Sequence, residues 1–360
     1  MADIAIAPGA AAASRRATGA PPPRSKRMQT QVSSRYVGTA IGAAIAPESG
    51  TCPLPTRWRA MDDCIIIGGG PAGLTAAIYL SRYHLKIRLF DCGSSRAALI
   101  PCTHNHAGYP EGVSGLDLLA AMRAQAEKYG TVREAAKVTA LRTVDGGFAA
   151  QIGEREVRAR SVLLATGVVN HRPPMPDGLH DAALAQGRIR YCPVCDGYEV
   201  TDKRVAVYGT GEHAAREALF VRSFTRDVTL IAPDAHDLPP AQQAELDAAG
   251  IERIDGPARD WAIEGEELTL SAAGGRFAFD SLYPALGSHI RSELAVQAGA
   301  RADPSGCLEV DDHQRTSLAG LFAAGDVAKG LDQISHAMGE AGVAATTIRN
   351  MLNAEAPLWR

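Results

Sequence analysis

The sequence predicts an α/β protein of two nested Rossmann-like, three-layer dinucleotide-binding domains, the second inserted into the first. Two glycine-rich turns carry this prediction, at residues 68–73 and 209–214, and each lies between a short apolar strand and a helix. The third observation is a Cys-x-x-C motif between the two turns, formed by Cys192 and Cys195. A chain of 360 residues is long enough for two such domains.

Composition and charge argue against several other classes of protein. The 46% hydrophobic and 21% charged residues are typical of a globular protein, and no apolar run approaches the roughly 20 residues of a membrane-spanning helix. A formal net charge of −3 gives no reason to expect nucleic acid or a membrane as a partner. Seven cysteines are too few for a secreted disulfide scaffold of this length, so we expect a cytoplasmic protein with one special cysteine pair.

Residues 1–60 differ from the rest and stay outside the fold prediction. They are rich in Ala, Pro, Ser and Arg, with Asp3 and Glu48 as the only acidic residues. One interpretation is a disordered extension, or a start codon assigned too early with Met61 as the true start. The other is a targeting segment, since transit peptides are rich in Arg and Ser and poor in acids.

The first domain begins with a short apolar run at 64–67, which predicts a strand buried on both faces. We expect further strands at 86–90, within 132–152, at 161–166 and within 320–326, and helices at 74–83, 113–129 and 334–352. The chain leaves this domain through a Pro-rich joint at 171–176 and returns through a second joint at 283–288. We therefore assign residues 61–172 and 288–355 to the first domain and residues 173–287 to the second.

The second domain repeats the same beginning. We expect a strand at 204–208, a helix to about residue 224, a strand at 228–231 and hairpin-like strands within 261–279.

The first turn has the G-x-G-x-x-G pattern of a pyrophosphate site. Its first glycine allows the tight turn, its second lets the backbone approach the phosphates, and its third packs the helix on the strand. The helix N-terminus adds free N–H groups and a favourable dipole. Asp91, about 20 residues further on, is placed to accept from a ribose hydroxyl. The candidate cofactor-binding residues here are Gly68, Gly70, Pro71, Ala72, Gly73 and Asp91.

The second turn has the pattern G-x-G-x-x-A, and its candidate nucleotide-binding residues are Gly209, Gly211 and Ala214. The strand after it lacks the arginine that an NADP 2′-phosphate needs, although Arg222 and Arg226 precede the strand. Asp234, at its end, suits the 2′-hydroxyl of NAD. The turn is therefore either a working nicotinamide site or a structural remnant.

Cys192 and Cys195 hold the candidate redox chemistry. A Cys-x-x-C brings two sulfurs close enough for a small-loop disulfide, and its surroundings can activate one thiolate. Asp196 follows directly and is placed to shuttle a proton. A structural zinc site needs a second cysteine or histidine pair, and we find no metal ligand set in the sequence. Zinc and inert buried cysteines remain the alternatives.

Together these motifs resemble the low-molecular-weight thioredoxin reductase family from about residue 61 to residue 352. The motifs that carry the resemblance, in family order, are 68–73, 105–110, 165–167, 192–196, 209–214 and 325–326. The resemblance implies an FAD-binding domain and an NAD(P)H-binding domain that carries the cysteines. It also implies a homodimer, rotation of one domain against the other, and a thioredoxin-like protein or small disulfide as partner.

The resemblance assigns roles residue by residue. Cys195 is expected to face the flavin, Cys192 to exchange with the substrate, and Asp196 to act as acid and base. Asn105 is expected near the isoalloxazine ring and Asp326 on the ribityl chain, while Gln333 and Ile334 present backbone N–H groups to the ring. The further family positions at the cofactor are Thr166, Gly167 and Gly325.

The sequence departs from the family at the missing arginines and at His104, His106 and His336. A related branch of dithiol oxidases lacks the NADPH site and passes electrons from a small dithiol to oxygen, and histidines near the cysteine pair suit such chemistry. Ordinary packing or solvation explains the same histidines. Three hypotheses stay open: a reductase, an NAD(P)H-independent dithiol oxidase, and a flavoprotein redox sensor without turnover. Cys102 lies near the expected flavin loop without an assigned role.

Overall fold

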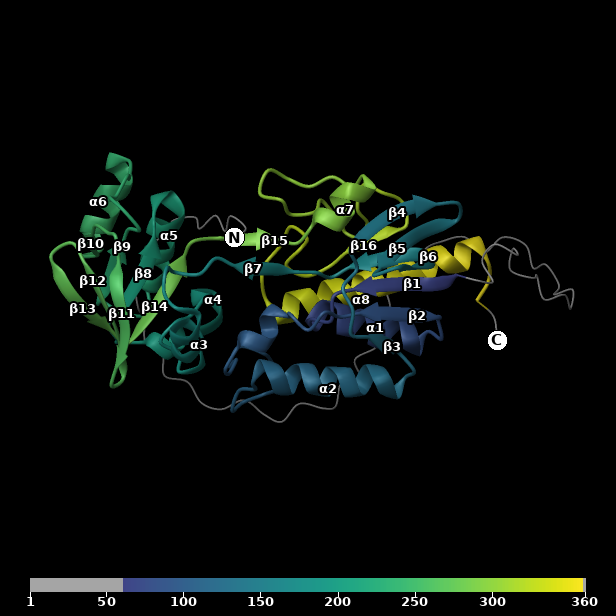
Figure 1. Cartoon of the computed structure of the whole chain (residues 1–360), viewed down its shortest axis with the longest axis horizontal. Coiled ribbons are helices and arrows are strands. Elements are labelled where there is room, and N and C mark those ends of the chain that lie inside the picture. The colour runs from purple at the N-terminus through teal and green to yellow at the C-terminus, as the bar shows by residue number, and fades with distance from the viewer. Residues whose placement is uncertain (1–60, 359–360) are drawn as a thin grey trace, which may run out of the picture. The chain divides into compact units, whose positions relative to one another are not determined.

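The computed structural model describes residues 61–358, so both interpretations of residues 1–60 lie outside the described part of the chain. One mixed and one parallel β-sheet, each with helices packed on it, confirm the predicted fold class (Figure 1). All strands of the second sheet come between β7 and β15 in the chain, so the second fold is inserted into the first. Every helix in residues 61–358 is too short or too polar to span a membrane.

The first sheet has seven strands in the order β3-β2-β1-β6-β5-β4, and β16 also pairs with β6. Strands β3, β2, β1, β6 and β16 are parallel, whereas β4, β5 and the first half of β6 form an antiparallel meander. Its strands are β1 (Asp62–Ile67), β2 (Ile87–Phe90), β3 (Val132–Glu134), β4 (Ala140–Val144), β5 (Gly147–Ile152), β6 (Arg155–Leu164) and β16 (Leu321–Ala323). The helical elements are α1 (Pro71–Arg82), η2 (Arg96–Leu99), α2 (Gly115–Lys128), α7 (Glu293–Ala298) and α8 (Ile334–Glu355).

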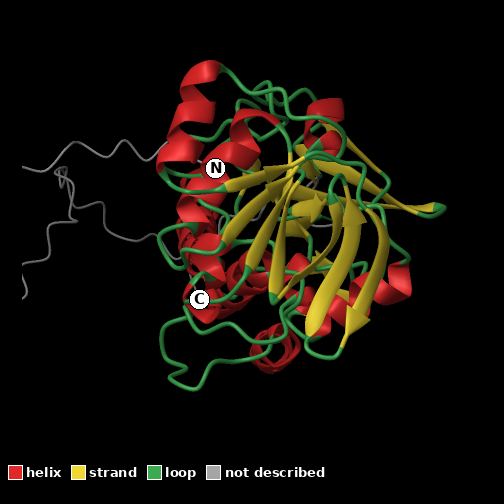
Figure 2. Cartoon of the chain, turned by 90° about the vertical axis from the view of Figure 1, so that its left-hand side faces the viewer, coloured by secondary structure: helices red, strands yellow, loops and turns green. Residues whose placement is uncertain are grey.

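The second sheet repeats this plan with four parallel strands in the order β10-β9-β8-β14. A separate three-stranded antiparallel sheet, β11-β12-β13, comes between β10 and β14 in the chain. Figure 2 shows the strands with helices packed alongside. The strands are β8 (Val205–Gly209), β9 (Val228–Ile231), β10 (Glu252–Ile254), β11 (Arg259–Glu264), β12 (Glu267–Ala272), β13 (Gly275–Phe279) and β14 (Ser281–Ala285). The helical elements are α3 (Asp177–Ala185), α4 (Pro193–Asp196), η3 (Tyr198–Val200), α5 (Gly211–Val221) and α6 (Pro240–Ala248).

The two crossings between the folds run side by side. Strands β7 (Val168–Asn170) and β15 (Ser288–Ile290) pair antiparallel, which joins the outgoing chain to the returning chain.

Each parallel sheet separates two hydrophobic clusters because alternate residues of a strand point to opposite faces. In β1, Cys64 and Ile66 belong to the cluster under α1 and α8, whereas Ile65 and Ile67 belong to the cluster on the other face. In β8, Val207 packs under α5 and Tyr208 packs against the antiparallel strands. Strands buried on both faces must be apolar throughout, which explains the unbroken apolar runs of the sequence.

The structure corrects several predicted boundaries. The helix expected over 113–129 begins at Gly115, because Ser114 caps it and accepts a hydrogen bond from the Asp117 N–H at 3.0 Å. The joint expected over 283–288 is shorter and comprises residues 286–287, since β14 runs to Ala285 and β15 begins at Ser288. Pro284 is tolerated in β14 because that strand lies at the edge of the four-stranded sheet, and its other side forms only an isolated bridge, between Leu282 and Ile189.

The first glycine-rich turn depends on backbone contacts that no side chain permits. Gly68 has φ +115°, and a Cβ there would lie 2.1 Å from the carbonyl oxygen of Ala165. A Cβ on Gly73 would lie 1.9 Å from the carbonyl oxygen of Gly68. These contacts hold β1, α1 and the end of β6 together, as the sequence pattern predicted.

We expect Gly73→Ala to lower the free energy of unfolding by about 3 kcal/mol or more, because the added methyl group overlaps a main-chain oxygen that cannot move aside. Denaturant unfolding measures the effect. Gly339→Ala is the matched control: it lies exposed in α8, where a Cβ meets nothing within 4 Å. Alanine there should raise stability by about 0.5–1 kcal/mol. Equal stability of the two variants would contradict the assigned packing.

Candidate functional site

A cavity of about 810 Å³ brings together most of the predicted site residues. Those that line it are Gly68, Gly70, Pro71, Ala72, Asp91, Asn105, Thr166, Gly167, Cys192, Cys195, Asp196, Gly325, Asp326, Gln333 and Ile334. Gly73 is buried behind the turn in α1. Gly209, Gly211 and Ala214 belong to the second sheet and do not line this cavity. The first turn and the redox pair are therefore parts of one site, and the second turn belongs to another.

The end of β2 offers an unused acceptor beside the first turn. Asp91 is 4% exposed, and one carboxylate oxygen accepts from the Gly93 N–H at 2.9 Å. Its other oxygen is buried without a hydrogen bond from any described residue, although Arg123 and Arg133 lie 3.6 and 3.9 Å away. A ribose hydroxyl is a donor that fits this oxygen.

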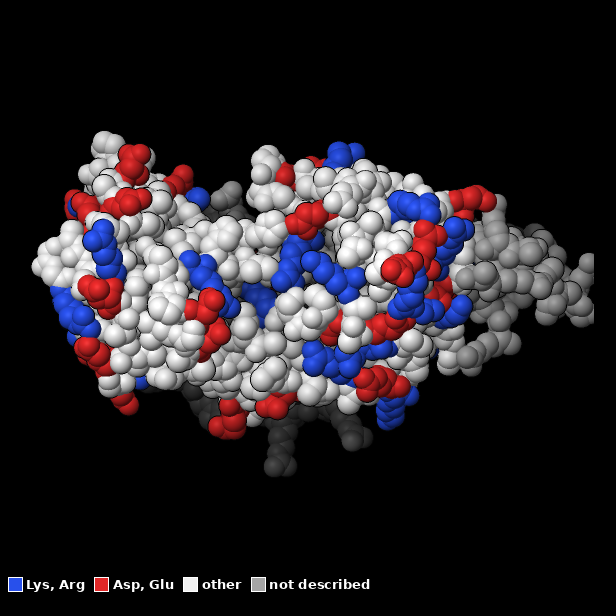
Figure 3. All heavy atoms as spheres, in the orientation of Figure 1, with Lys and Arg blue, Asp and Glu red and all other residues white. Residues whose placement is uncertain are grey.

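The N-terminus of α1 is open to an anion. Its N-cap is Gly70, which has no side chain to cap the first N–H groups. These groups line the cavity with Gly68 and Pro71, as a pyrophosphate requires. Figure 3 shows Lys and Arg side chains gathered near the middle of the face seen in Figure 1, and Arg96, Lys137, Arg190 and Arg291 are the basic residues that line the cavity. The turn, the acceptor and the cavity together fit the adenosine and pyrophosphate of FAD.

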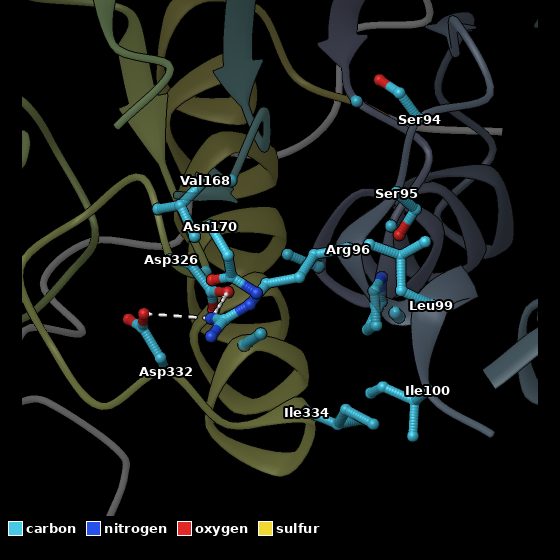
Figure 4. Close-up of a pocket in the computed structure, with 18 of the residues that line it drawn as sticks. Ser94, Ser95, Arg96, Leu99, Ile100, Val168, Asn170, Asp326, Asp332 and Ile334 are labelled. Carbon is cyan, nitrogen blue, oxygen red and sulfur yellow. Dashed lines mark hydrogen bonds and ion pairs between the residues drawn. The ribbon is translucent and has the colours of Figure 1, made fainter. Parts of the chain in front are cut away.

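An arginine that sequence reasoning missed reaches across the cavity. Arg96 extends from η2, and its Nη1 lies 3.1 Å from Asp326 and 3.2 Å from Asp332 (Figure 4). Burial and then the neighbouring Asp326 raise the pKa of Asp332, which Arg96 opposes. Asp326 is therefore at the predicted place, but it is ion-paired to Arg96.

The redox pair is a disulfide. Cys192 and Cys195 are joined with their Cα atoms 5.2 Å apart, and Cys192 caps the short helix α4 by accepting from the Cys195 N–H at 3.1 Å. The two cysteines are bonded to each other and line the cavity, which argues against the alternative of inert buried cysteines. Among residues 61–358, no cluster of three or more His, Cys, Asp or Glu side chains is arranged for a metal ion.

A hydrogen-bonded chain orients one donor toward the disulfide. Thr103 Oγ1 donates to the Asn105 side-chain oxygen at 2.9 Å, and the Asn105 amide donates to the Gln333 oxygen at 2.9 Å. Because its oxygen is engaged, Gln333 presents its amide nitrogen to the sulfurs, at 3.1 Å from Cys195 and 3.4 Å from Cys192. Asn105 and Gln333, which were expected at the flavin ring, are thus linked to the redox pair through their side chains.

Two side chains hold the carboxylate of Asp196, the residue that directly follows Cys195. Arg190 Nη1 donates to one carboxylate oxygen at 3.0 Å, and the Tyr283 hydroxyl donates to the other at 2.9 Å. Burial raises the pKa of the Asp196 carboxyl, and Arg190 and Tyr283 oppose that rise. A carboxyl with a raised pKa next to a dithiol can both hold and release a proton, which is the predicted role.

A second buried carboxyl lies behind Asp196. Glu217 on α5 is 4% exposed, and one of its oxygens has no hydrogen-bond partner among the described residues. Its other oxygen lies 3.7 Å from His213 Nε2. Burial, and then the charge of Asp196, raise the pKa of Glu217 to about 7. No sequence pattern points to Glu217, because its burial depends on the packing of α5.

Of the two arginines that precede β9, Arg222 is engaged elsewhere. Arg222 donates to the main-chain oxygens of Ala249 and Thr225, so it packs α5 and does not fold back over β9. Asp234 lies exposed just beyond β9.

The three histidines differ in their surroundings. His336 pairs with the buried Glu340 at 2.9 Å and does not line the cavity, which supports the packing interpretation. His106 stacks on Tyr109 with ring centroids 5.6 Å apart. Only His104 of the three lines the cavity.

We expect Glu217→Gln to stabilise the protein at alkaline pH. A folded-state pKa of about 7 against the ordinary 4.5 means that the protonated acid contributes stability below pH 4.5, which is lost as pH rises through 7. Glutamine mimics the neutral acid at every pH, so the variant should gain up to roughly 3 kcal/mol at pH 8–9 and little near pH 4.5. Thermal unfolding across pH measures this.

Glu212→Gln, on the same helix and 61% exposed, is the control and should show no such pH-dependent gain. A pH-independent effect of Glu217→Gln would rule out the raised pKa.

Comparisons with known proteins agree with this site. The profile of the family described as Pyridine nucleotide-disulphide oxidoreductase matches residues 62–341. A thioredoxin reductase of Mycolicibacterium smegmatis is 31% identical over 290 residues, which cover 75% of this chain and 89% of the relative.

Two solved structures extend the likeness to three dimensions. The thioredoxin reductase of Streptococcus pyogenes superimposes with a TM-score of 0.76 at 26% identity, covering 82% of this chain and 99% of that one. The crystal structure of HlmI gives a TM-score of 0.75 at 25% identity, covering 82% and 93%. The chain therefore belongs to the pyridine nucleotide-disulphide oxidoreductase family, as a thioredoxin reductase-like, FAD-dependent disulfide oxidoreductase.

Proposed function

We propose that this enzyme passes electrons from NAD(P)H through FAD to the Cys192–Cys195 disulfide, and from there to a thioredoxin-like protein or a small disulfide. One observation carries the proposal: the disulfide lines the same cavity as the dinucleotide turn and Asp91. Residues 61–172 and 288–355 form the FAD-binding domain in this proposal. Residues 173–287 form the NAD(P)H-binding-like domain, which carries the redox pair.

In this proposal, different cavity residues bind different parts of FAD. The first turn and Asp91 hold the pyrophosphate and the adenosine ribose, and Thr166, Gly167, Gly325 and Asp326 hold the middle of the molecule. Asn105, Gln333 and Ile334 lie at the end of the cavity next to the disulfide. When bound, FAD supplies a carrier that takes two electrons from a nicotinamide and delivers them to a disulfide.

The cysteines have separate tasks. Cys195 faces the flavin, which its shorter contact with Gln333 supports, and Cys192 exchanges with the substrate disulfide. The thiolate is the reactive form in each exchange, so a proton must leave and return at every turnover. Asp196 takes this proton, because its carboxyl is buried and within one residue of Cys195.

The second turn is the proposed site of the nicotinamide nucleotide. Gly209, Gly211 and Ala214 shape the turn between β8 and α5, and a Cβ on Gly211 would meet nothing within 4 Å, so the turn is open to a ligand. No Lys or Arg occurs in residues 232–239, and Asp234 stands where an acid binds the 2′-hydroxyl of NAD. We therefore expect NADH to be preferred to NADPH.

A homodimer and a cytoplasmic location complete the proposal. Tyr79 and Tyr83 of α1 and Val343 of α8 are apolar or aromatic side chains that are 36–42% exposed on neighbouring helices. Such a surface suits contact with a second copy of the chain.

Anaerobic titration of the yellow protein with NADH and then NADPH tests the electron donor. We expect rapid bleaching of the flavin absorbance by NADH and slower bleaching by NADPH, because no arginine is in place for the 2′-phosphate. An unchanged spectrum with both, followed by bleaching with a small dithiol, would contradict the reductase and support the dithiol oxidase.

Asp196→Asn should slow the reduction of a disulfide substrate by roughly 100-fold, since a positioned acid–base group contributes about that much. Flavin bleaching by the nicotinamide should be unchanged, which separates proton transfer at the dithiol from the earlier step. Stopped-flow absorbance follows both. Asp202→Asn, exposed and near the motif, should behave as the native enzyme. Native rates in Asp196→Asn would refute this role.

A further inference from the structure

Three side chains at the cavity form an arrangement that the proposed function does not use. Cys102 Sγ lies 3.6 Å from His104 Nε2, and His104 Nδ1 lies 2.9 Å from the Glu199 carboxylate. All three residues line the same cavity as Cys192 and Cys195. A nucleophile, a base that can take its proton, and an acid that orients the base are the parts of an activated thiol.

The backbone around Cys102 is built to bring two of these side chains together. Thr103 and Val113 form an antiparallel bridge, so residues 102 and 104 project to the same side of the extended segment. Gly112 lies opposite them with φ +74°. A Cβ on Gly112 would lie 2.5 Å from the Cys102 sulfur and 2.7 Å from His104 Cδ2, so glycine makes the room that both side chains occupy.

The third member comes from the redox segment itself. Glu199 lies in η3, just after the cysteine motif, and its side chain is 22% exposed. One of its oxygens holds His104, and the other is buried without a hydrogen-bond partner among residues 61–358. This contact between His104 and Glu199 therefore ties the loop that carries Cys102 to the segment that carries the Cys192–Cys195 disulfide.

The other free cysteines of the described chain lack this environment. Cys64 is fully buried, and burial raises the pKa of its thiol to about 12. Cys92 contacts the Ser94 hydroxyl at 3.2 Å, and neither it nor the half-exposed Cys307 forms a hydrogen bond with a histidine of the described chain. Cys102 is exposed and is paired with an imidazole.

We propose that Cys102 is a third redox-active thiol, activated by His104 and Glu199, which makes the first covalent bond with a small disulfide substrate and exchanges with Cys192. The inference rests on the proposed function, because the Cys192–Cys195 dithiol supplies the two electrons. A small disulfide is the substrate that this arrangement suits, because Cys102, Cys192 and Cys195 line the same cavity. The Cys192–Cys195 pair then does not need to leave the cavity, as it would to meet a large protein.

The exchange balances as three displacements. The Cys102 thiolate, whose proton His104 has taken, attacks one sulfur of the substrate; that disulfide breaks, and the leaving thiolate receives the proton from His104. The Cys192 thiolate attacks the Cys102 sulfur, forming a Cys102–Cys192 disulfide and releasing the second substrate thiolate. The Cys195 thiolate then attacks Cys192, which restores the Cys192–Cys195 disulfide and frees Cys102. The two protons of the original dithiol end on the two product thiols.

A variant that stops after the second displacement tests the proposal. Cys195→Ser holoenzyme, reduced, desalted anaerobically and checked for its flavin absorbance, is mixed with 5,5′-dithiobis(2-nitrobenzoate) at less than one equivalent. We expect two thionitrobenzoates per reagent molecule, because the first thiol takes one half and the second displaces the other. Peptide mass mapping without reduction should show a Cys102–Cys192 disulfide.

The control variants test whether Cys102 is one of the two thiols. Cys195→Ser with Cys102→Ser should release one thionitrobenzoate per reagent, whereas Cys195→Ser with Cys307→Ser should release two. His104→Asn in the Cys195→Ser background should slow the first release by roughly 100-fold, as expected for loss of the base that takes the Cys102 proton. In the otherwise native enzyme, Cys102→Ser should reduce the same reagent at least about tenfold more slowly.

Two results would overturn the proposal: a single thionitrobenzoate and no Cys102–Cys192 peptide from Cys195→Ser, or native turnover in Cys102→Ser. The thiol exchange needs no nicotinamide. Its failure is therefore distinct from failure of the proposed function, which shows as an unbleached flavin in the native protein.

Discussion

The close approach of backbone at the first glycine-rich turn fixes the position of everything else in the cavity. The backbone of Gly68 contacts the end of β6, and the backbone of Gly73 contacts Gly68. A side chain at either position would overlap main-chain atoms, so the close spacing of β1, β6 and α1 depends on these two glycines. The carboxyl ends of the parallel strands β1, β2, β6 and β16 then meet at one edge of the sheet. Asp91, Thr166 and Asp326 follow three of those ends, which is why residues more than 200 positions apart face one cofactor-sized space.

Local patterns in the sequence were sufficient for the turns, the buried strands and the redox motif, because each is encoded within a few residues. They were insufficient wherever a contact joins distant segments. Nothing in the sequence near Arg96 indicates that it bridges Asp326 and Asp332, since the pairing depends on how η2 packs across the cavity. Cys102 and His104 lie in one loop, whereas Glu199 comes from a distant segment. The contact between His104 and Glu199 therefore could not be predicted from local sequence patterns.

Two buried carboxyls are linked electrostatically next to the redox motif: Asp196, which follows Cys195 directly, and Glu217 of α5. Asp196 is held by Arg190 and Tyr283, which favour its charged form and limit the rise in its pKa from burial. Glu217 has no such hydrogen-bonded cation, so burial and the charge of Asp196 raise its pKa to about 7. When two acids lie close together, the negative charge of one disfavours ionisation of the other. Ionisation of one therefore favours retention of a proton on the other, near the pair that needs it.

The contacts that hold the redox segment at the cavity are individually weak. The Gln333 amide and the His104–Glu199 pair are the contacts that join it to the cofactor side near the sulfurs. A neutral hydrogen bond or a half-exposed ion pair contributes roughly 0.5–1 kcal/mol, so separating both costs about as much as a tenfold change in population. These two contacts therefore oppose departure of the pair from the cavity only weakly. A small disulfide that reacts at Cys102 avoids even that cost, and its reduction should depend less on motion of the redox segment than reduction of a protein does.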